Sequence, residues 1–215
     1  CKIAREILRG EHEVSRVIAR PFIGEPGNFI RTANRHDYSV VPPEATVLDN
    51  IKDAGLMVLG IGKINDIYVG QGITEAISTK SNKDGIEKTI KALRTQTDRG
   101  IIFTNLVDFD AKFGHRNNPQ GYADALAEFD QHLPQIMEVL SKDDILVITA
   151  DHGNDPTYPG TDHTREYVPI LVAGAAIQPV NLGIRSTFAD LAATIADIFD
   201  VKAPPQGISF KEGIF

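Results

Sequence analysis

The sequence predicts an α/β fold, a sandwich of helices around a mostly parallel β-sheet. Short runs of continuously apolar residues, such as those at 56–62 and 101–107, alternate along the chain with longer segments of helical spacing. Continuous apolar runs are typical of strands buried on both faces, and their alternation with amphipathic helices is the pattern of βαβ units. A chain of 215 residues is long enough for one sizeable domain with a small appendage.

The first part of the chain is expected to be less regular than the rest. Helical spacing runs through residues 2–9, and residues 14–23 have the composition of a strand that stops at Pro21. Residues 24–45 are rich in Gly, Pro and Asn, which is typical of a long irregular connection. Long loops in compact domains usually link parts or carry function, so this connection is the best candidate for a domain boundary.

From residue 46 onward the pattern is regular. Apolar residues recur with helical spacing in four segments, which we predict to be helices: 46–54, 82–96, 118–140 and 186–200. Short apolar runs predict strands at 56–62, 101–107, 145–151 and 168–174. Ligands bind beyond the carboxyl ends of the strands in sheets of this kind. The residues that follow these strands are therefore the first candidates for a functional site.

Composition argues against several classes of protein. The net charge of −7 is unfavourable for a nucleic-acid binder that works by bulk electrostatics. No apolar run reaches about 18 residues, so no membrane-spanning helix is expected. The single cysteine, Cys1, allows no internal disulfide and suits a reducing compartment, from which we predict a cytoplasmic location.

Polar side chains that could bind a metal ion follow two of the predicted strands. The strand at 101–107 precedes Asp108, Asp110 and His115, and the strand at 145–151 leads to Asp151, His152 and His163. Neighbouring strand ends lie about 4.8 Å apart in a parallel sheet, so the two groups could share one centre. Carboxylates and imidazoles bind cations such as Zn²⁺ and Mn²⁺, and two such ions suit phosphoryl chemistry.

Each of these residues alone has a simpler interpretation. A lone Asp after a strand is usually a turn residue or a helix N-cap, and Asp151–His152 before a glycine could be only a turn. The joint pattern of two strand ends and a third histidine favours the metal site. Asp108 and Asp110 compete for one position, because both point the same way if the strand continues through them, and spacing does not choose between them.

Two segments, NLVDFDAKFGHRNNPQGY and ITADHGNDPTYPGTDHTREYVP, resemble the metal-binding core of the alkaline phosphatase superfamily. Within it the phosphopentomutase family is the closest match, since RPFIGEPGNFIRTANRHDYSVVPP and GIGKINDIY also resemble that family. The resemblance implies an alkaline-phosphatase-like three-layer α/β/α core with a mostly parallel sheet, plus part of a small α+β cap domain. Residues 1–40 would be the partial cap, and residues 41–215 the C-terminal part of the metal-binding core.

The same resemblance assigns roles to the candidate ligands. It implies that Asp110, His115 and His163 bind one Mn²⁺, and that Asp151 and His152 form part of a second Mn²⁺ site. The family's remaining Asp ligand, and the threonine that carries the phosphoryl group, would precede Cys1. The chain is therefore expected to be a C-terminal part without its catalytic nucleophile, and to be inactive alone.

The resemblance also implies a reaction, the interconversion of (deoxy)ribose 1-phosphate and 5-phosphate through a phospho-enzyme and a bisphosphate, with a sugar bisphosphate as activator. Expected substrate-binding residues are Arg16, Ile18 and Arg31 in the cap and Lys63 at a core strand end. Arginine is suited to a bidentate grip on phosphate. The partner would be a small sugar phosphate, with no nucleic acid or membrane, and the intact protein a monomer. The alternatives are a metal-dependent phosphatase or phosphodiesterase of the same superfamily, or a non-catalytic metal-binding remnant.

Overall fold

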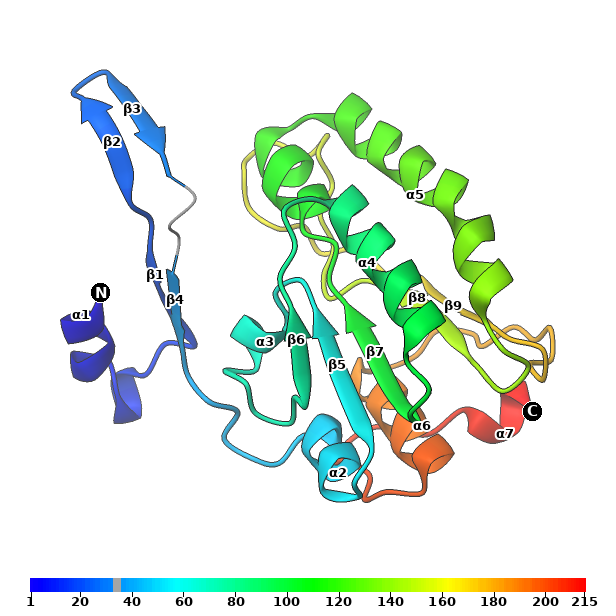
Figure 1. Cartoon of the computed structure of the whole chain (residues 1–215). Coiled ribbons are helices and arrows are strands. Elements are labelled where there is room, and N and C mark those ends of the chain that lie inside the picture. Colours follow the sequence, from blue (N-terminus) through cyan, green and yellow to red (C-terminus); the bar gives the residue numbers. More distant parts are fainter. Residues whose placement is uncertain (33–35) are drawn as a thin grey trace.

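The core of the molecule is a parallel β-sheet flanked by helices (Figure 1). The structure, a computed structural model, describes residues 1–32 and 36–215, without the side chain of Arg31. β5 (Met57–Ile61) is the central strand of three and pairs in parallel with β6 (Glu75–Ile77) and β7 (Gly100–Thr104). The predicted α/β class with a parallel sheet is confirmed.

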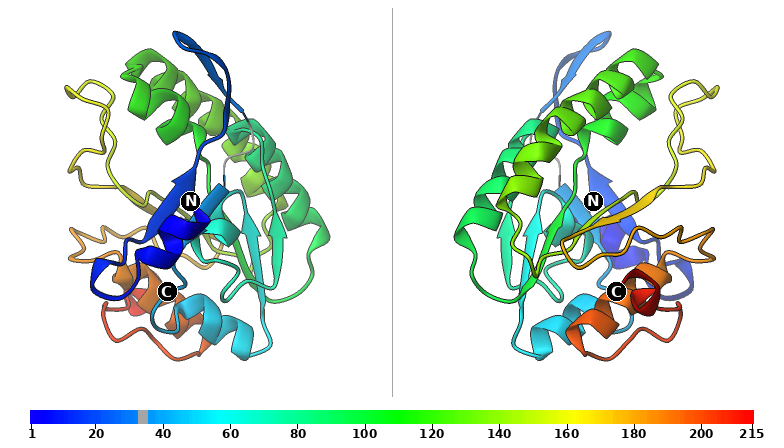
Figure 2. Two further views of the ribbon diagram at one scale, coloured as in Figure 1. Left: turned by 90° about the vertical axis from the view of Figure 1, so that its left-hand side faces the viewer. Right: turned by 90° about the vertical axis from the view of Figure 1, so that its right-hand side faces the viewer.

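Helices cover both faces of this sheet, which gives the expected three layers (Figures 1 and 2). One outer layer contains α4 (Asn82–Thr95) and α5 (Pro119–Val139), and the other contains α2 (Val47–Asp53) and α6 (Ala189–Phe199). Three shorter helices complete the set in the described residues: α1 (Lys2–Ile7), α3 (Ile64–Ile67) and α7 (Lys211–Ile214). None of the helices in residues 1–32 and 36–215 has the length and apolar character needed to cross a membrane.

The side chains of β5 alternate between the two layers. Val58 packs against Leu48 and Ile51 of α2, whereas Leu59 packs with Ala92 of α4. This alternation follows from the two-residue period of a strand. Every residue of β5 is buried, which explains why its sequence is a continuous apolar run.

The N-terminal part is more regular than the sequence suggested. The predicted strand at 14–23 is broken at Pro21 into β1 (Arg16–Ala19) and β2 (Phe22–Glu25). The segment predicted as an irregular connection contains β3 (Asn28–Arg31), which pairs antiparallel with β2, and β4 (His36–Ser39), which pairs with β1. That prediction was wrong. The Pro26–Gly27 turn explains the hairpin, because proline presets its own φ and Gly27 takes a φ of +91°.

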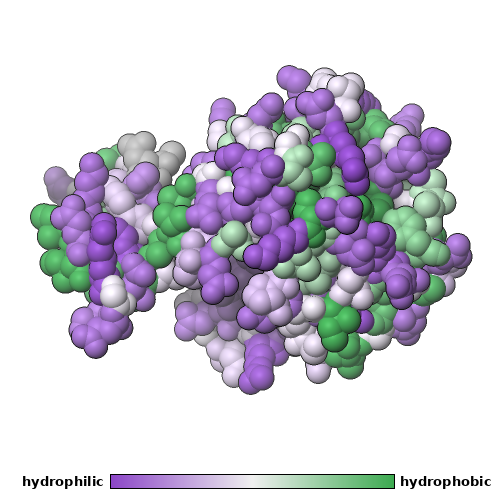
Figure 3. Space-filling model, turned by 90° about the horizontal axis from the view of Figure 1, so that it is seen from below, coloured by the Kyte–Doolittle hydropathy of each residue, from purple (hydrophilic) through white to green (hydrophobic). Residues whose placement is uncertain are grey.

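This N-terminal part projects from the core as a lobe, which Figure 3 shows from below with apolar side chains on its surface. Four apolar side chains of the β2–β3 hairpin are exposed: Phe22, Ile23, Phe29 and Ile30. β4 contacts α3, which joins the lobe to the core. The division into a partial cap of residues 1–40 and a core part of residues 41–215 stays a prediction.

The last two strands of the core differ from the βαβ pattern expected of them. β8 (Leu146–Thr149) and β9 (Ile170–Ala173) pair antiparallel, because a loop instead of a crossover helix connects them. Figure 1 places this pair on the β7 side of the sheet, yet no ladder joins β7 to β8 within the described part of the chain. Leu106 and Leu146 still pack into one apolar cluster with α4 and α5.

Candidate metal centre

The chain after β7 winds into a tight turn that separates the two competing aspartates. β7 ends at Thr104, and a π-helical turn, η2 (Phe109–Phe113), follows instead of a longer strand. Short π-helical segments are rare and occur frequently at functional sites. The strand does not continue through Asp108 and Asp110. The two side chains therefore do not share one face of it, which was one of the possibilities that the sequence left open.

Asp108 contacts the start of α4. Its Oδ2 accepts hydrogen bonds from the backbone N–H of Asn82 at 2.9 Å and from Lys112 Nζ at 2.9 Å. Its own N–H donates to Asn82 Oδ1 at 2.8 Å. These contacts tie the end of β7 to helix α4, so Asp108 has a structural position, and Asp110 is the residue that enters the histidine cluster.

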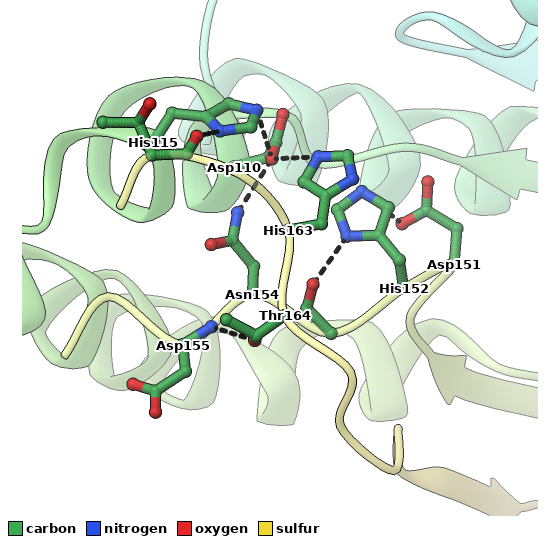
Figure 4. Close-up of polar contacts among 10 residues, drawn as sticks. Asp110, His115, Asp151, His152, Asn154, Asp155, His163 and Thr164 are labelled. Atoms are coloured by element: carbon green, nitrogen blue, oxygen red, sulfur yellow. Dashed lines mark hydrogen bonds and ion pairs between the residues drawn. The ribbon is translucent and has the colours of Figure 1, made fainter. Parts of the chain in front are cut away.

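The carboxylate of Asp110 meets two imidazoles at one oxygen (Figure 4). The distance from Asp110 Oδ1 to His115 Nε2 is 3.1 Å, and the distance to His163 Nε2 is also 3.1 Å. His115 lies in η3 (Gly114–Arg116), one turn after Asp110, whereas His163 comes from the loop that follows β8. Residues 53 positions apart thus converge on a single oxygen.

Each of these two separations suits a pair of ligands on one cation. Ligands at about 2.1 Å from an ion are separated by roughly 3.0 Å in octahedral geometry and roughly 3.4 Å in tetrahedral geometry. The two distances of 3.1 Å from Asp110 Oδ1 fall in this range. One carboxylate oxygen and two imidazole nitrogens form a donor set typical of Zn²⁺ or Mn²⁺.

Backbone carbonyls orient two of the three imidazoles. Nδ1 of His115 bonds the carbonyl oxygen of Thr161, and Nδ1 of His152 bonds that of Gly153. A carbonyl oxygen only accepts, so each Nδ1 is the donor in these contacts, and Nε2 is the ring nitrogen left to bind a metal ion. Metal-binding histidines in proteins almost always donate their other ring N–H in this way.

The Asp151–His152 pair at the end of β8 adjoins the same cluster. The ring of His152 stacks on that of His163 with 3.6 Å between the centroids. Ligand atoms of Asp110, His152 and His163 all lie within 4.8 Å of one another. Asp151 is the most exposed of the group, with 73% of its side chain accessible and its Oδ1 3.7 Å from His152 Nε2. The structure therefore brings together all five residues expected to be ligands (Figure 4).

A cavity of about 300 Å³ lies beside His152 and is lined by Tyr122, Asn154 and Glu166, among others. Burial raises the pKa of the Tyr122 phenol, and the nearby carboxylates of Asp110 and Asp151 raise it further. Tyr122 therefore keeps its proton at neutral pH and can donate a hydrogen bond. The cavity leaves room for a small ligand next to the cluster.

The residues expected to bind substrate are placed less closely together. Arg16 and Ile18 lie on β1, where Arg16 Nη1 bonds Asp37 Oδ2 of β4 at 3.3 Å. Arg31 ends β3, and its side chain lies outside the described residues. Figure 1 shows these strands apart from the ends of β7 and β8. Lys63 follows β5 at the start of α3, at the carboxyl edge of the sheet.

Sequence reasoning missed one side chain of the cluster. Asn154 Nδ2 donates to the same Asp110 Oδ1 at 2.8 Å. No signal in the sequence pointed to this contact, because Asn154 and Asp110 are 44 residues apart.

Comparisons with known proteins show the family of this chain. Three similar curated relatives are phosphopentomutases: that of Clostridioides difficile is 59% identical over 100% of this chain, that of Alkaliphilus metalliredigens 58% over 100%, and that of Carboxydothermus hydrogenoformans 60% over 98%. The chain spans only about half of these relatives, 55%, 55% and 54% of their respective lengths. The family model described as Metalloenzyme superfamily matches residues 9–203. With nearly the whole chain matched, and with residues that could hold a metal ion gathered at its strand ends, this protein belongs to the Metalloenzyme superfamily.

Proposed function

We propose that this chain is the C-terminal part of a phosphopentomutase, which interconverts (deoxy)ribose 1-phosphate and 5-phosphate. In this proposal Asp110, His115 and His163 bind one Mn²⁺, and Asp151 and His152 supply half of a second site. The observation that carries the proposal is the contact of two imidazole Nε2 atoms with one oxygen of Asp110, each at 3.1 Å. The high identity to phosphopentomutases over the whole chain supports the choice of reaction.

The residues of the cluster fit a divalent ion, because they offer carboxylate oxygen and imidazole nitrogen at suitable separations. Bound there, Mn²⁺ would polarise phosphoryl oxygens and offset the charge that develops on them. Other residues of this chain would bind the substrate. Tyr122 can donate a hydrogen bond into the adjoining cavity, and Arg16 can offer its guanidinium to the distal phosphate once the lobe approaches the core.

The sheet supports the view that the catalytic unit is larger than this chain. β7 pairs only with β5, and β8 pairs only with β9, among the strands of the described residues. The residues of β7 are only partly buried, whereas those of β5 are fully buried. Unpaired edges of apolar strands are normally covered in native proteins. We infer that polypeptide corresponding to the uncovered half of the relatives pairs with these edges and carries the nucleophile, a threonine that a sugar bisphosphate primes.

Calorimetric titration of the chain with Mn²⁺ tests the metal assignment. We expect one Mn²⁺ to bind appreciably more tightly than a second, because only one ligand set is complete in this chain. Two equally tight sites, or no binding, would contradict the assignment. Assay with ribose 5-phosphate tests the rest, since isomerisation by this chain alone at a normal enzymatic rate would show that no nucleophile is missing. Release of free phosphate would instead indicate a phosphatase.

A further inference from the structure

The carboxamide of Asn154 lies between the two segments that carry the proposed ligands (Figure 4). Its Nδ2 donates to Asp110 Oδ1 at 2.8 Å, the same oxygen that meets both imidazoles. An ionised carboxylate only accepts hydrogen bonds, so the amide nitrogen must face it. Asn154 thus bonds the first segment, which holds Asp110, while its backbone belongs to the second, which holds His152.

The carboxamide has little freedom to move. A Cβ atom on Gly114 would collide with the amide group of Asn154, so the glycine leaves just enough room for it. Gly114 has an ordinary helical φ of −60°, which any residue can adopt. The backbone conformation is therefore not the reason that a glycine occupies this position. On the other side, the backbone of Gly153 is bridged to Thr164, and Thr164 Oγ1 accepts from the N–H of Asp155 at 2.7 Å.

Stability alone does not favour an asparagine at this position. Asn154 Oδ1 is buried and has no hydrogen-bond partner among the described residues. A buried acceptor without a partner costs about 1–3 kcal/mol, which an alanine would avoid. Residues that break a local rule in this way are expected at functional sites. The same carboxamide that leaves its oxygen unpaired also donates the hydrogen bond to Asp110, and we take this hydrogen bond as the reason for the asparagine.

We propose that Asn154 is a positioning residue for the metal centre: it holds Asp110 Oδ1 between His115 and His163 and couples that ligand set to the Asp151–His152 pair. Gly114 serves the same purpose by leaving space for the carboxamide. The inference rests on the metal site of the proposed function. Partners that orient metal ligands are typically worth about 10–100-fold in metal affinity, so Asn154→Ala should weaken the tight Mn²⁺ site by at least about 10-fold.

The test compares Mn²⁺ titration calorimetry with thermal unfolding of the metal-free chain. Asn154→Ala should lower Mn²⁺ affinity while the metal-free melting temperature stays the same or rises, because the unpaired oxygen is gone. Gly114→Ala should also lower the affinity, by displacing the carboxamide. In the double variant the added methyl no longer meets an amide, so the double variant should bind Mn²⁺ as Asn154→Ala alone does.

The matched control is Asn117→Gly, which deletes another amide of the same site region. Asn117 Nδ2 bonds the carbonyl of Tyr158 at 3.0 Å and contacts no proposed ligand, and its φ of +48° suits glycine. This variant should keep parental Mn²⁺ affinity.

The outcomes separate the two proposals. Failure of the parent chain to bind Mn²⁺ would overturn the metal site and this inference together. Parental affinity in Asn154→Ala would overturn the inference alone. A loss of affinity matched by an equal loss in Asn117→Gly, or fully additive losses in the double variant, would show that the asparagine acts only through general loop structure, which also overturns it.

Discussion

Replacement of His163 by alanine should remove most of the stabilisation that Mn²⁺ gives to this chain. His163 would supply one of the three proposed ligand atoms, and its Nε2 lies 3.1 Å from Asp110 Oδ1. Loss of a direct ligand should exceed the effect of losing an orienting partner, so we expect at least about 100-fold weaker binding. His132 is the matched control, because its Nδ1 bonds the Glu128 carbonyl within α5, away from the cluster.

The expected size follows from mass action. With Mn²⁺ at 100 times the parental Kd, binding stabilises the folded chain by about 2.7 kcal/mol. A chain of this size gains about 2–4 °C per kcal/mol, so the melting temperature should rise by roughly 5–11 °C. At the same Mn²⁺ concentration a 100-fold weaker variant gains only about 0.4 kcal/mol, or roughly 1–2 °C.

Thermal unfolding with and without Mn²⁺ measures this difference directly. Only the Mn²⁺-induced shift is compared, so any change in the metal-free melting temperature of either variant cancels. His132→Ala should retain the full shift, and His163→Ala should lose most of it. Equal shifts in the two variants would refute the ligand assignment.

Three further predictions concern aspartates outside the ligand set. Asp108→Asn should cost about 1 kcal/mol of unfolding free energy, measured in urea, and leave Mn²⁺ affinity unchanged, because this carboxylate bonds the start of α4. Asp190→Ala should cost about 2–3 kcal/mol in the same assay. Asp190 is 2% exposed, and its loss removes the carboxylate partner of Arg185, which keeps its hydrogen bond to the Ile208 carbonyl. The partial exposure of Arg185 moderates the penalty. The hydrogen bond from Lys88 holds the pKa of Asp84 below its usual value. The contribution of the ionised Asp84 carboxylate to the free energy of unfolding should therefore be complete above about pH 4 and disappear as the pH falls further. The parent should be more stable than Asp84→Asn near neutral pH, and this difference in unfolding free energy should vanish in acid.

The core could be predicted from the sequence because its signals are local and repeated. β5 reads as a continuous apolar run since both of its faces are buried, and α4 begins at Ser81, whose side chain caps the helix. The β2–β3 hairpin was missed because its Pro26–Gly27 turn was taken for loop composition, although the register pairs Glu25 with Asn28 directly across those two residues. The antiparallel pairing of β8 with β9 depends on which strands are neighbours in space. The hydrophobic periodicity of the sequence carries no information on that.

The site shows the same division between local and non-local information. Spacing indicated that polar groups gather after two strands, but it could not choose between Asp108 and Asp110, because the choice depends on a π-helical turn after β7. Asn154 was invisible for a related reason. Its partner is 44 residues away, and only the folded loop brings the amide to Asp110.

The incompleteness that we propose for the second site and the unpaired strand edges have one structural explanation. Asp110 follows β7 and Asp151 follows β8, so each of the two proposed ligand groups follows a strand that pairs on one side only in the described residues. A strand that paired with either edge would run beside a ligand-bearing strand and bring one of its own ends to the cluster. The uncovered half of the relatives' length is more than enough for such a strand. Completion of the sheet and completion of the second Mn²⁺ site should therefore occur together, and a polypeptide that does only one of these would not be the natural complement of this chain.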